Sequence, residues 1–113
     1  LFYFADEIDY EEKAARKFLK PAALKAMQLL LAQLETLDSF SEENLETAFK
    51  TVMDRTGIKL GKIAQPVRVA LTGKTASPGI FEVAAIIGKH KVISRLRKAI
   101  QYIERRRPNK RSV

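Results

Sequence analysis

The sequence contains no cysteine among its 113 residues. This absence excludes a disulfide scaffold, a thiol nucleophile and the cysteine-rich structural zinc sites. Histidine is nearly absent too, because His90 is the only one and has no second imidazole or thiol with which to share a metal ion. We therefore interpret His90 as a solvated residue in a basic turn between two helices. The composition is compatible with the reducing cytoplasm, where we expect the protein to work.

Long apolar runs are also missing. Residues 1–4 are apolar, but this run is far shorter than the roughly 20 residues that span a bilayer. No basic residue precedes the run and no small-residue cleavage site follows it, so it does not resemble a signal peptide. We expect no membrane partner. Because the chain starts at Leu1 rather than at a methionine, we expect it to be an internal piece of a longer polypeptide, with the length of one domain.

Acidic residues are scarce in the second half of the chain. Residues 1–56 carry seven basic and eleven acidic side chains, whereas residues 57–113 carry fourteen basic and two acidic ones. The formal charges of the two halves are therefore −4 and +12. A field of this strength attracts polyanions and speeds their encounter with the protein. Nucleic acid and an anionic membrane surface both fit, and we favour nucleic acid.

No stretch shows the two-residue alternation of a half-buried strand, whereas apolar residues recur at three- and four-residue steps in six segments. The predicted fold class is all-α, with about six short helices. We expect Asp9 to cap the first helix, which ends before Pro21. Pro21 is expected to begin the second helix. Ser41 should cap the third helix, and Gly57 should end it in a left-handed conformation.

The second half of the chain is predicted to hold three further helices. Pro66 is expected to start or kink the fourth, which runs to about Leu71. A loop then leads to Ser77, which we expect to cap the fifth helix, with Pro78 at its first position. The fifth helix should stop at Gly88. The sixth is amphipathic, and the basic residues expected to spread over its other sides are Lys91, Arg95, Lys98 and Arg105.

Two sequence patterns could indicate catalysis, but neither meets the requirements of a catalytic motif. Residues 73–75 resemble the end of a phosphate-binding loop, but that motif needs a glycine at the position of Arg68 and a preceding strand, where we predict a helix. Paired carboxylates such as Glu42 and Glu43 diverge by about 100° on a helix and lie at helix starts, where they complement the helix dipole. We predict no catalytic residue.

The segment from Arg68 to Phe81 offers a different chemistry. Lys74 supplies a positive charge, Ser77 a helix start with free N–H groups, and Phe81 an aromatic ring. Sequence-specific RNA-binding proteins stack unpaired loop bases on aromatic rings or guanidinium planes. We therefore predict Arg68 and Phe81 as base-stacking residues. The alternative for Phe81 is a place in the core, because its neighbour Ile80 begins the buried stripe of the fifth helix.

The same region carries a family resemblance. The sequence GKIAQPVRVALTG at 61–73, with SPGIFE at 77–82 and GK at 88–89, closely resembles the C-terminal signature of bacterial glutamyl-tRNA synthetases. The acidic segment at 6–12 and the junction at 18–21 are similar in kind. The resemblance extends over nearly the whole chain, to about Ile103.

The resemblance implies a helical cage, or superhelical bundle, over residues 1–104 that grips the anticodon loop of a glutamate tRNA. A basic and frayed tail over residues 105–113 lies outside it. The expected nucleic-acid-binding residues are Lys62, Arg68, Lys74, Ser77, Pro78, Ile80 and Phe81.

Each part of this set has an implied role. Arg68 would stack on, or bond to, the first anticodon base. Ser77 and Pro78 would offer hydroxyl and backbone groups to base edges, while Ile80 and Phe81 would supply apolar surface under the unstacked rings. Some family members have threonine at the position of Ser77, which keeps the hydroxyl.

The catalytic signatures of the family, of His-Ile-Gly-His and Lys-Met-Ser-Lys-Ser type, are absent from the chain. The resemblance therefore implies no enzymatic activity for this piece. ATP, glutamate and magnesium would bind to the catalytic domain of the same parent chain, which would be its other partner. We expect a monomer.

Two alternatives stay open. The fifth and sixth helices, joined at residues 88–89, could form a helix-turn-helix that places the last helix in the major groove of DNA. Against this, residues 89–92 offer poor readers of base edges. The other alternative is a protein-interaction domain that docks its acidic half on a partner, and no specific feature supports it.

Overall fold

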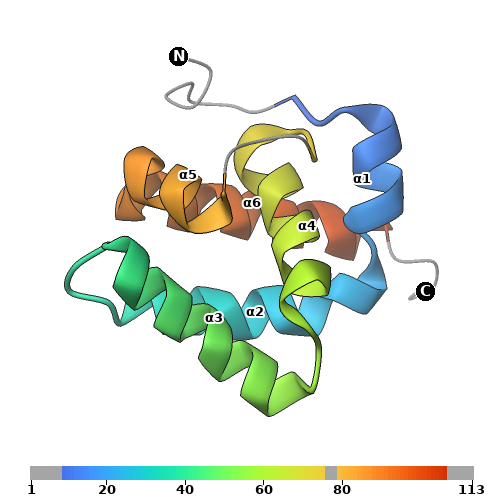
Figure 1. Cartoon of the computed structure of the whole chain (residues 1–113). Coiled ribbons are helices and arrows are strands. Elements are labelled where there is room, and N and C mark those ends of the chain that lie inside the picture. Colours follow the sequence, from blue (N-terminus) through green and yellow to red (C-terminus); the bar gives the residue numbers. More distant parts are fainter. Residues whose placement is uncertain (1–8, 76–78, 107–113) are drawn as a thin grey trace.

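The computed structural model describes residues 9–75 and 79–106, and the described residues form six α-helices without a strand (Figure 1). This confirms the all-α prediction. Ser77 and Pro78, and residues 107–113 of the expected tail, lie outside the described residues. The helices are α1 (Glu12–Phe18), α2 (Pro21–Glu35), α3 (Glu42–Thr56), α4 (Leu60–Thr72), α5 (Ile80–Ile87) and α6 (Lys89–Arg106).

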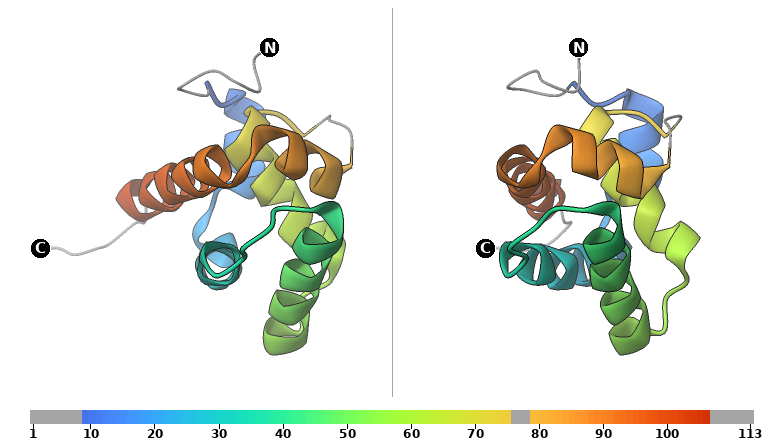
Figure 2. Two further views of the ribbon diagram at one scale, coloured as in Figure 1. Left: turned by 90° about the vertical axis from the view of Figure 1, so that its left-hand side faces the viewer. Right: turned by 60° about the vertical axis from the view of Figure 1, so that its left-hand side comes forward.

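The helices pack around one hydrophobic core. Helix α2 packs against α3, α4 and α6, and α6 also packs against α4 and α5. Helix α6 runs behind α4 and α5 in Figure 1, and the side view in Figure 2 places α3 and α6 on opposite sides of the molecule. The largest buried side chains come from α2, α3, α4 and α6 and from the residue that follows α1: Leu19, Met27, Leu30, Leu34, Leu45, Phe49, Val52, Ile63, Val67, Leu71, Leu96 and Ile103.

Individual residues determine where α2 begins and where α3 begins and ends. Pro21 occupies the first turn of α2, where its missing N–H is not needed. The Ser41 hydroxyl oxygen accepts the N–H of Asn44 at 3.1 Å and so caps α3. Gly57 ends α3 with φ of 73°, a conformation that glycine adopts freely because it has no Cβ. These three predictions are confirmed.

The start of α1 differs from the prediction. Its N-cap is Glu11, and no side chain caps it, so the expected cap by Asp9 is wrong. The backbone N–H of Glu11 donates instead to the carbonyl of Gly73 at 2.8 Å. Tyr10 packs edge to face on Tyr102, with ring centroids 5.0 Å apart. These long-range contacts hold residues 9–11 outside the helix and outweigh a capping signal worth about 1 kcal/mol.

Helix α4 begins earlier than expected. It starts six residues before Pro66, so Pro66 lies inside the helix and does not start it. A proline there cannot donate to the carbonyl of Lys62, four residues earlier, and costs about 3 kcal/mol. Ile63 and Val67 are buried on either side of it. Burying each such side chain contributes about 1.5–3 kcal/mol, which offsets the cost.

Helix α5 begins later than expected. Its N-cap is Gly79, so the expectation that Ser77 is the N-cap residue is wrong, and Ser77 itself lies outside the described residues. The helix ends at Gly88 as predicted, and the φ of this glycine is 92°. Helix α6 follows directly, so His90 lies exposed in its first turn rather than in a turn between helices.

Helix α6 buries a charged side chain. The expectation that Arg95 lies on the exposed basic side is wrong, because it is only 4% exposed. Its Nη1 donates to the carbonyl of Leu71 at 2.9 Å. Position 95 lies three residues after the buried Val92 and four before the buried Ala99, so it belongs to the same helix face. A charged group on this face is stable because it has a buried acceptor.

Candidate nucleic-acid interface

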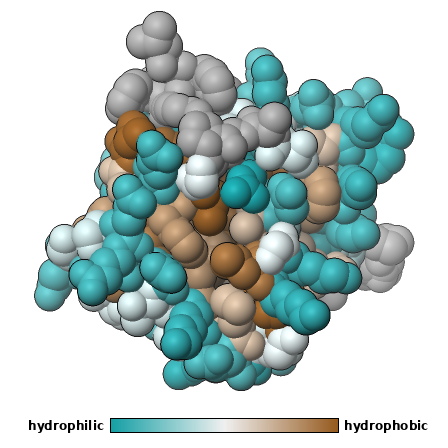
Figure 3. Space-filling model, in the orientation of Figure 1, coloured by the Kyte–Doolittle hydropathy of each residue, from teal (hydrophilic) through white to brown (hydrophobic). Residues whose placement is uncertain are grey.

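Helices α4 and α5 carry the two predicted base-stacking residues and pack against each other. Arg68 lies in the second half of α4, and Phe81 lies in the first turn of α5. Both side chains are half-buried, so neither belongs to the fully buried core. Figure 3 shows apolar atoms near the centre of the face over α3, α4 and α5, with hydrophilic residues around them.

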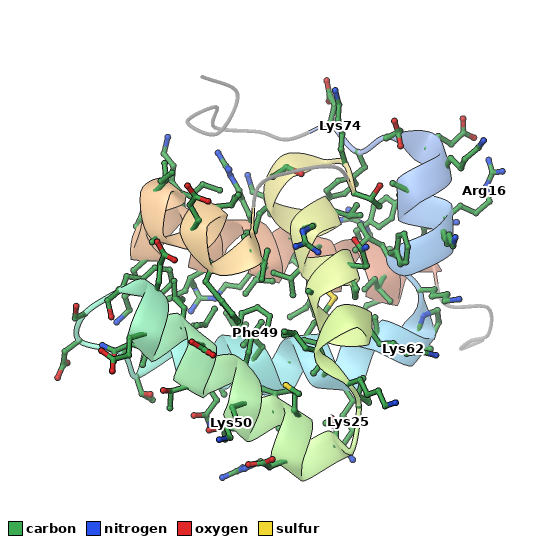
Figure 4. The ribbon with its side chains drawn as sticks, in the orientation of Figure 1. Arg16, Lys25, Phe49, Lys50, Lys62 and Lys74 are labelled. Carbon is green, nitrogen blue, oxygen red and sulfur yellow. The ribbon has the colours of Figure 1, made fainter. Side chains whose placement is uncertain are left out.

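The ring of Phe81 packs against a buried aromatic ring of α3. It meets Phe49 of α3 edge to face, with centroids 5.2 Å apart and an interplanar angle of 79°. Phe49 is 2% exposed and points into the interior of the bundle (Figure 4). Ile80, the preceding residue, is 4% exposed and belongs to the core. The ring of Phe81 therefore takes part in packing and also keeps accessible surface.

As far as the described residues show, two buried side-chain atoms on α4 have no hydrogen-bond partner. The Nε of Arg68 is buried and has no hydrogen-bond acceptor within the described ranges. The Oε1 of Gln65 is likewise buried without a donor. Residues three apart lie on the same side of a helix, so the two atoms belong to neighbouring side chains. An unpaired buried polar atom costs about 1–3 kcal/mol, and a ligand that pairs with it removes that cost. Sequence reasoning did not single out Gln65.

Hydrogen bonds of the Thr72 side chain stabilise the turn after α4. The Thr72 hydroxyl donates to the carbonyl of Arg68 at 2.8 Å and accepts the N–H of Lys74 at 3.2 Å. Gly73 adopts a left-handed φ of 83°, which lets the chain reverse immediately after the helix. The Lys74 side chain is exposed and points away from the bundle (Figure 4). This turn therefore presents one lysine from a fixed backbone.

Lys62 and Lys74 do not lie together. Lys62 occupies the first turn of α4, whereas Lys74 follows its end. The rise of a helix over this interval is about 18 Å. Figure 4 shows the two side chains at opposite ends of the helix. Lys62 thus lies apart from Lys74. Of the other described residues of the predicted set, Arg68 lies between these two along α4, and Ile80 and Phe81 lie in the first turn of α5.

Two further properties concern the described residues only. Within 9–75 and 79–106, no group of three histidine, aspartate or glutamate side chains is placed to hold a metal ion. Over the same ranges, every helix is too short or too polar to cross a membrane.

Comparisons with known proteins agree on one family. Residues 1–100 match a family model described as an anticodon binding domain. The glutamate-tRNA ligase of Syntrophobacter fumaroxidans is 51% identical over 104 residues, which are 92% of this chain and 22% of that protein. The glutamate-tRNA ligase of Geobacter sulfurreducens is 45% identical over 104 residues, with the same coverage of each chain.

A solved structure is similar too. The glutamate tRNA ligase from Elizabethkingia meningosepticum, in complex with its amino acid, superposes with a TM-score of 0.82 at 30% identity. The match covers 90% of this chain and 20% of that one. The chain thus spans about a fifth of the length of the relatives that it matches.

Proposed function

Since the chain belongs to the anticodon-binding domains of glutamate-tRNA ligases, we propose that it recognises the anticodon loop of a glutamate tRNA. The observation that supports this proposal most directly is that two half-buried side chains, Arg68 and Phe81, lie on helices that pack against each other. The first is a half-buried guanidinium with an unpaired Nε, and the second is a half-buried ring supported by Phe49. A loop of RNA has unstacked bases and phosphates that match both groups.

In the proposed complex, Arg68 stacks on the first anticodon base or bonds to its edge, and its Nε gains an acceptor. Phe81 supplies apolar surface to an unstacked base, and the buried Ile80 supports that surface from below. Ser77 and Pro78 lie between these residues in the sequence. We propose that they offer hydroxyl and backbone groups to the base edges.

Charge brings the RNA to this surface. Lys74 is exposed at the turn after α4, beside the segment that leads into α1, and residues 57–113 carry a large excess of basic side chains. Phosphate contacts dominate the affinity of such surfaces and make it depend on salt, whereas base contacts supply the discrimination. The isolated chain should therefore bind an anticodon arm weakly and lose this binding as salt rises.

The test uses an RNA hairpin that carries the glutamate anticodon arm and a second hairpin with a changed first anticodon base. Arg68→Ala and Phe81→Ala should each weaken binding to the first hairpin by about five- to a hundred-fold and reduce the preference for it over the second. Fluorescence anisotropy measures both affinities. Circular dichroism melting shows whether each variant is folded, and a Phe81→Ala variant that unfolds would assign Phe81 to the core alone.

Two variants serve as matched controls. Arg55→Ala removes an arginine at the end of α3, and Ile86→Ala removes an apolar side chain that is 51% exposed on α5. Both should leave the preference between the two hairpins unchanged. Equal affinity of the unaltered chain for both hairpins and for duplex DNA would contradict the proposal.

The DNA-binding alternative fits the structure poorly. Lys89 at the start of α6 donates through Nζ to the carbonyls of Glu35 and Leu37, at 3.1 and 2.7 Å. Arg97, two turns further, pairs with Glu35. These bonds hold the first half of α6 against the end of α2, and α6 packs against three helices. A recognition helix must leave its first turns free to enter a groove.

The parent protein would attach glutamate to this tRNA. We propose that ATP and magnesium bind in its catalytic domain, outside this chain, and that this domain and the tRNA are the partners of the chain. A monomeric parent working in the cytoplasm completes the proposal.

A further inference from the structure

A cavity that the proposed function does not use lies between the end of α1, the start of α2 and the first half of α4. Its volume is about 400 Å³. Neither Arg68 nor Phe81 lines it, but Lys62 does. Figure 4 shows Lys62 on the side of α4 that faces α1 and the start of α2. The lysine that lies apart from the other predicted residues thus belongs to a separate concave surface.

Three lysines form the rim of this cavity. They are Lys17 of α1, Lys20 just after it, and Lys62 of α4, and all three are exposed. No ion pair within the described ranges involves them. Lys17 and Lys20 come from the net acidic half of the sequence. The fold therefore builds a local cationic rim from both halves, suited to an anion with more than one charged group.

The floor of the cavity is apolar, and the Nζ of Lys17 lies over the Phe18 ring, 5.4 Å from its centroid. The floor includes the half-buried side chains of Phe18 and Ile58 and the buried ring of Pro66. Ala22 and Ala23 line the wall on the α2 side, and their small side chains leave the space open. A planar heterocycle fits against an aromatic ring and a proline ring better than a flexible aliphatic chain does, because it loses less conformational freedom.

Within the part of the chain that the structure describes, two residues that line the cavity carry an acceptor that lacks a donor or its usual helical donor. Gln65, whose buried Oε1 has no donor, is one of the lining residues. Pro66 has no N–H, so the carbonyl of Lys62 cannot receive its usual helical bond. A ligand with N–H groups on a planar ring would satisfy such acceptors. Nucleobases combine this edge with a flat face and an attached phosphate.

We propose that the lysine-rimmed cavity holds one unstacked nucleotide of single-stranded RNA. The base lies against Phe18 and Pro66, and its flanking phosphates lie among Lys17, Lys20 and Lys62. This inference rests on the proposed function, because the RNA is the loop that binds at Arg68. Lys62 and Arg68 are separated by about 9 Å along the axis of α4, so one strand can reach both surfaces.

Single tryptophan reporters test the proposal, because the sequence contains no tryptophan. Phe18→Trp places an indole at the cavity, and in a separate protein Phe81→Trp places one at the other surface. The probe is the anticodon-arm RNA hairpin at low salt. A base stacked on the indole should quench its fluorescence, so we expect the hairpin to quench both variants with the same apparent Kd.

The pattern of quenching separates the two proposals. Quenching in Phe81→Trp without quenching in Phe18→Trp would overturn the cavity proposal and leave the proposed function standing. Quenching in Phe18→Trp alone would support the cavity and count against the anticodon surface. No quenching in either variant would overturn both. Should Phe18→Trp fail to fold by circular dichroism, Ile58→Trp supplies the reporter from a half-buried position on the cavity floor and leaves the alanines of the wall unchanged.

Charge variants test the rim separately. Lys20→Gln and Lys62→Gln should each lower the slope of log Kd against log salt by about one, and Lys98→Gln on α6 is the matched control that should not. Heparin is the second probe, since it is a polyanion without bases. If heparin quenches Phe18→Trp as strongly as the hairpin does, the cavity is a general anion patch and the nucleotide proposal is wrong.

Discussion

Arg95 and Arg97 lie two positions apart on α6 and have opposite environments. Arg95 is 4% exposed and donates to the carbonyl of Leu71 at 2.9 Å, whereas Arg97 is exposed and pairs with Glu35. A buried hydrogen bond to a charged group contributes about 1.5–3 kcal/mol, and its loss leaves a carbonyl unpaired. An exposed ion pair contributes about 0–1 kcal/mol. The two arginines should therefore differ sharply in their effect on stability.

We predict that Arg95→Met lowers the free energy of unfolding by about 2–3 kcal/mol. Arg97→Met, the control on the same helix, should lower it by less than about 1 kcal/mol. Urea unfolding followed by circular dichroism measures both values. Losses of similar size in the two variants would show that the Arg95 bond adds nothing to stability.

Tyr10 links stability to alkaline pH. Burial, helped by the nearby Tyr102, raises the pKa of the Tyr10 hydroxyl above 10.0, although Arg105 acts in the opposite direction. Because the folded pKa is the higher one, the neutral phenol contributes stability that is complete below the unfolded pKa of about 10 and is lost as pH rises through the folded pKa.

Accordingly, the unaltered chain should lose stability more steeply than Tyr10→Phe as the pH rises from about 9 to about 11. Urea unfolding of both proteins over this range gives the two slopes. The phenylalanine variant keeps the ring packed on Tyr102 but has no hydroxyl to ionise. Parallel slopes would mean that Tyr10 ionises equally easily in the folded and unfolded chains.

For single residues, the spacing of a residue along its helix predicted burial better than its chemical type did. The 3-4 spacing around Arg95 places it on the buried face, whereas its charge led to the expectation of an exposed position. Buried Ile80 agrees with its place in the apolar stripe. The half-buried state of Phe81 depends on Phe49 of α3, which lies far away in the sequence, so the sequence left both interpretations of this ring open.

Among the helices, α3 has the best-defined start. The Ser41 hydroxyl oxygen accepts the N–H of Asn44 at 3.1 Å, and Glu42 and Glu43 follow in the positive first turn. Ser41→Ala should lower the free energy of unfolding by about 1 kcal/mol, because one N–H loses its acceptor.

The matched variant Ser41→Asp keeps an acceptor at the same position and should preserve most of the stability. Thermal and urea unfolding measure the stability of the unaltered chain and of the two variants. If alanine and aspartate have equal effects, the cap contributes nothing to the stability of α3.

A helix boundary was predicted correctly where a residue next to that boundary determines it. The starts of α2 and α3 and the ends of α3 and α5 depend on a proline, a serine and two glycines within the helices' own segments, and these were predicted correctly. The starts of α1 and α4 depend on contacts with distant segments, which no local pattern contains. For α1 the deciding contact is the bond from Glu11 to Gly73.

For the whole molecule, the arrangement of charge matters more than the total. The sequence halves have opposite net charge, and all the expected nucleic-acid-binding residues lie in the basic half, residues 57–113. The fold instead places Lys17 and Lys20 beside Lys62. This cluster could not be predicted from the sequence, because it requires the relative positions of α1, α2 and α4. The pairing of α4 with α5 was likewise visible only in the structure.

The affinity of the whole chain for the anticodon-arm hairpin should fall steeply with salt. With about four phosphate contacts, raising KCl from about 50 to about 200 mM should weaken binding about 50- to 150-fold. Anisotropy titrations at several KCl concentrations give the slope. An affinity that is independent of KCl would exclude a binding mode based on phosphates.

The hydrogen bond from the Glu11 N–H to the Gly73 carbonyl joins two segments that are more than sixty residues apart. One leads into α1, and the other leaves α4 toward the residues proposed to touch RNA. A shift of either segment stretches this bond, and Tyr102 limits the movement of Tyr10 beside it. Residues 9–11 and the turn after α4 are thus mechanically coupled, and neither can be displaced alone without breaking a contact.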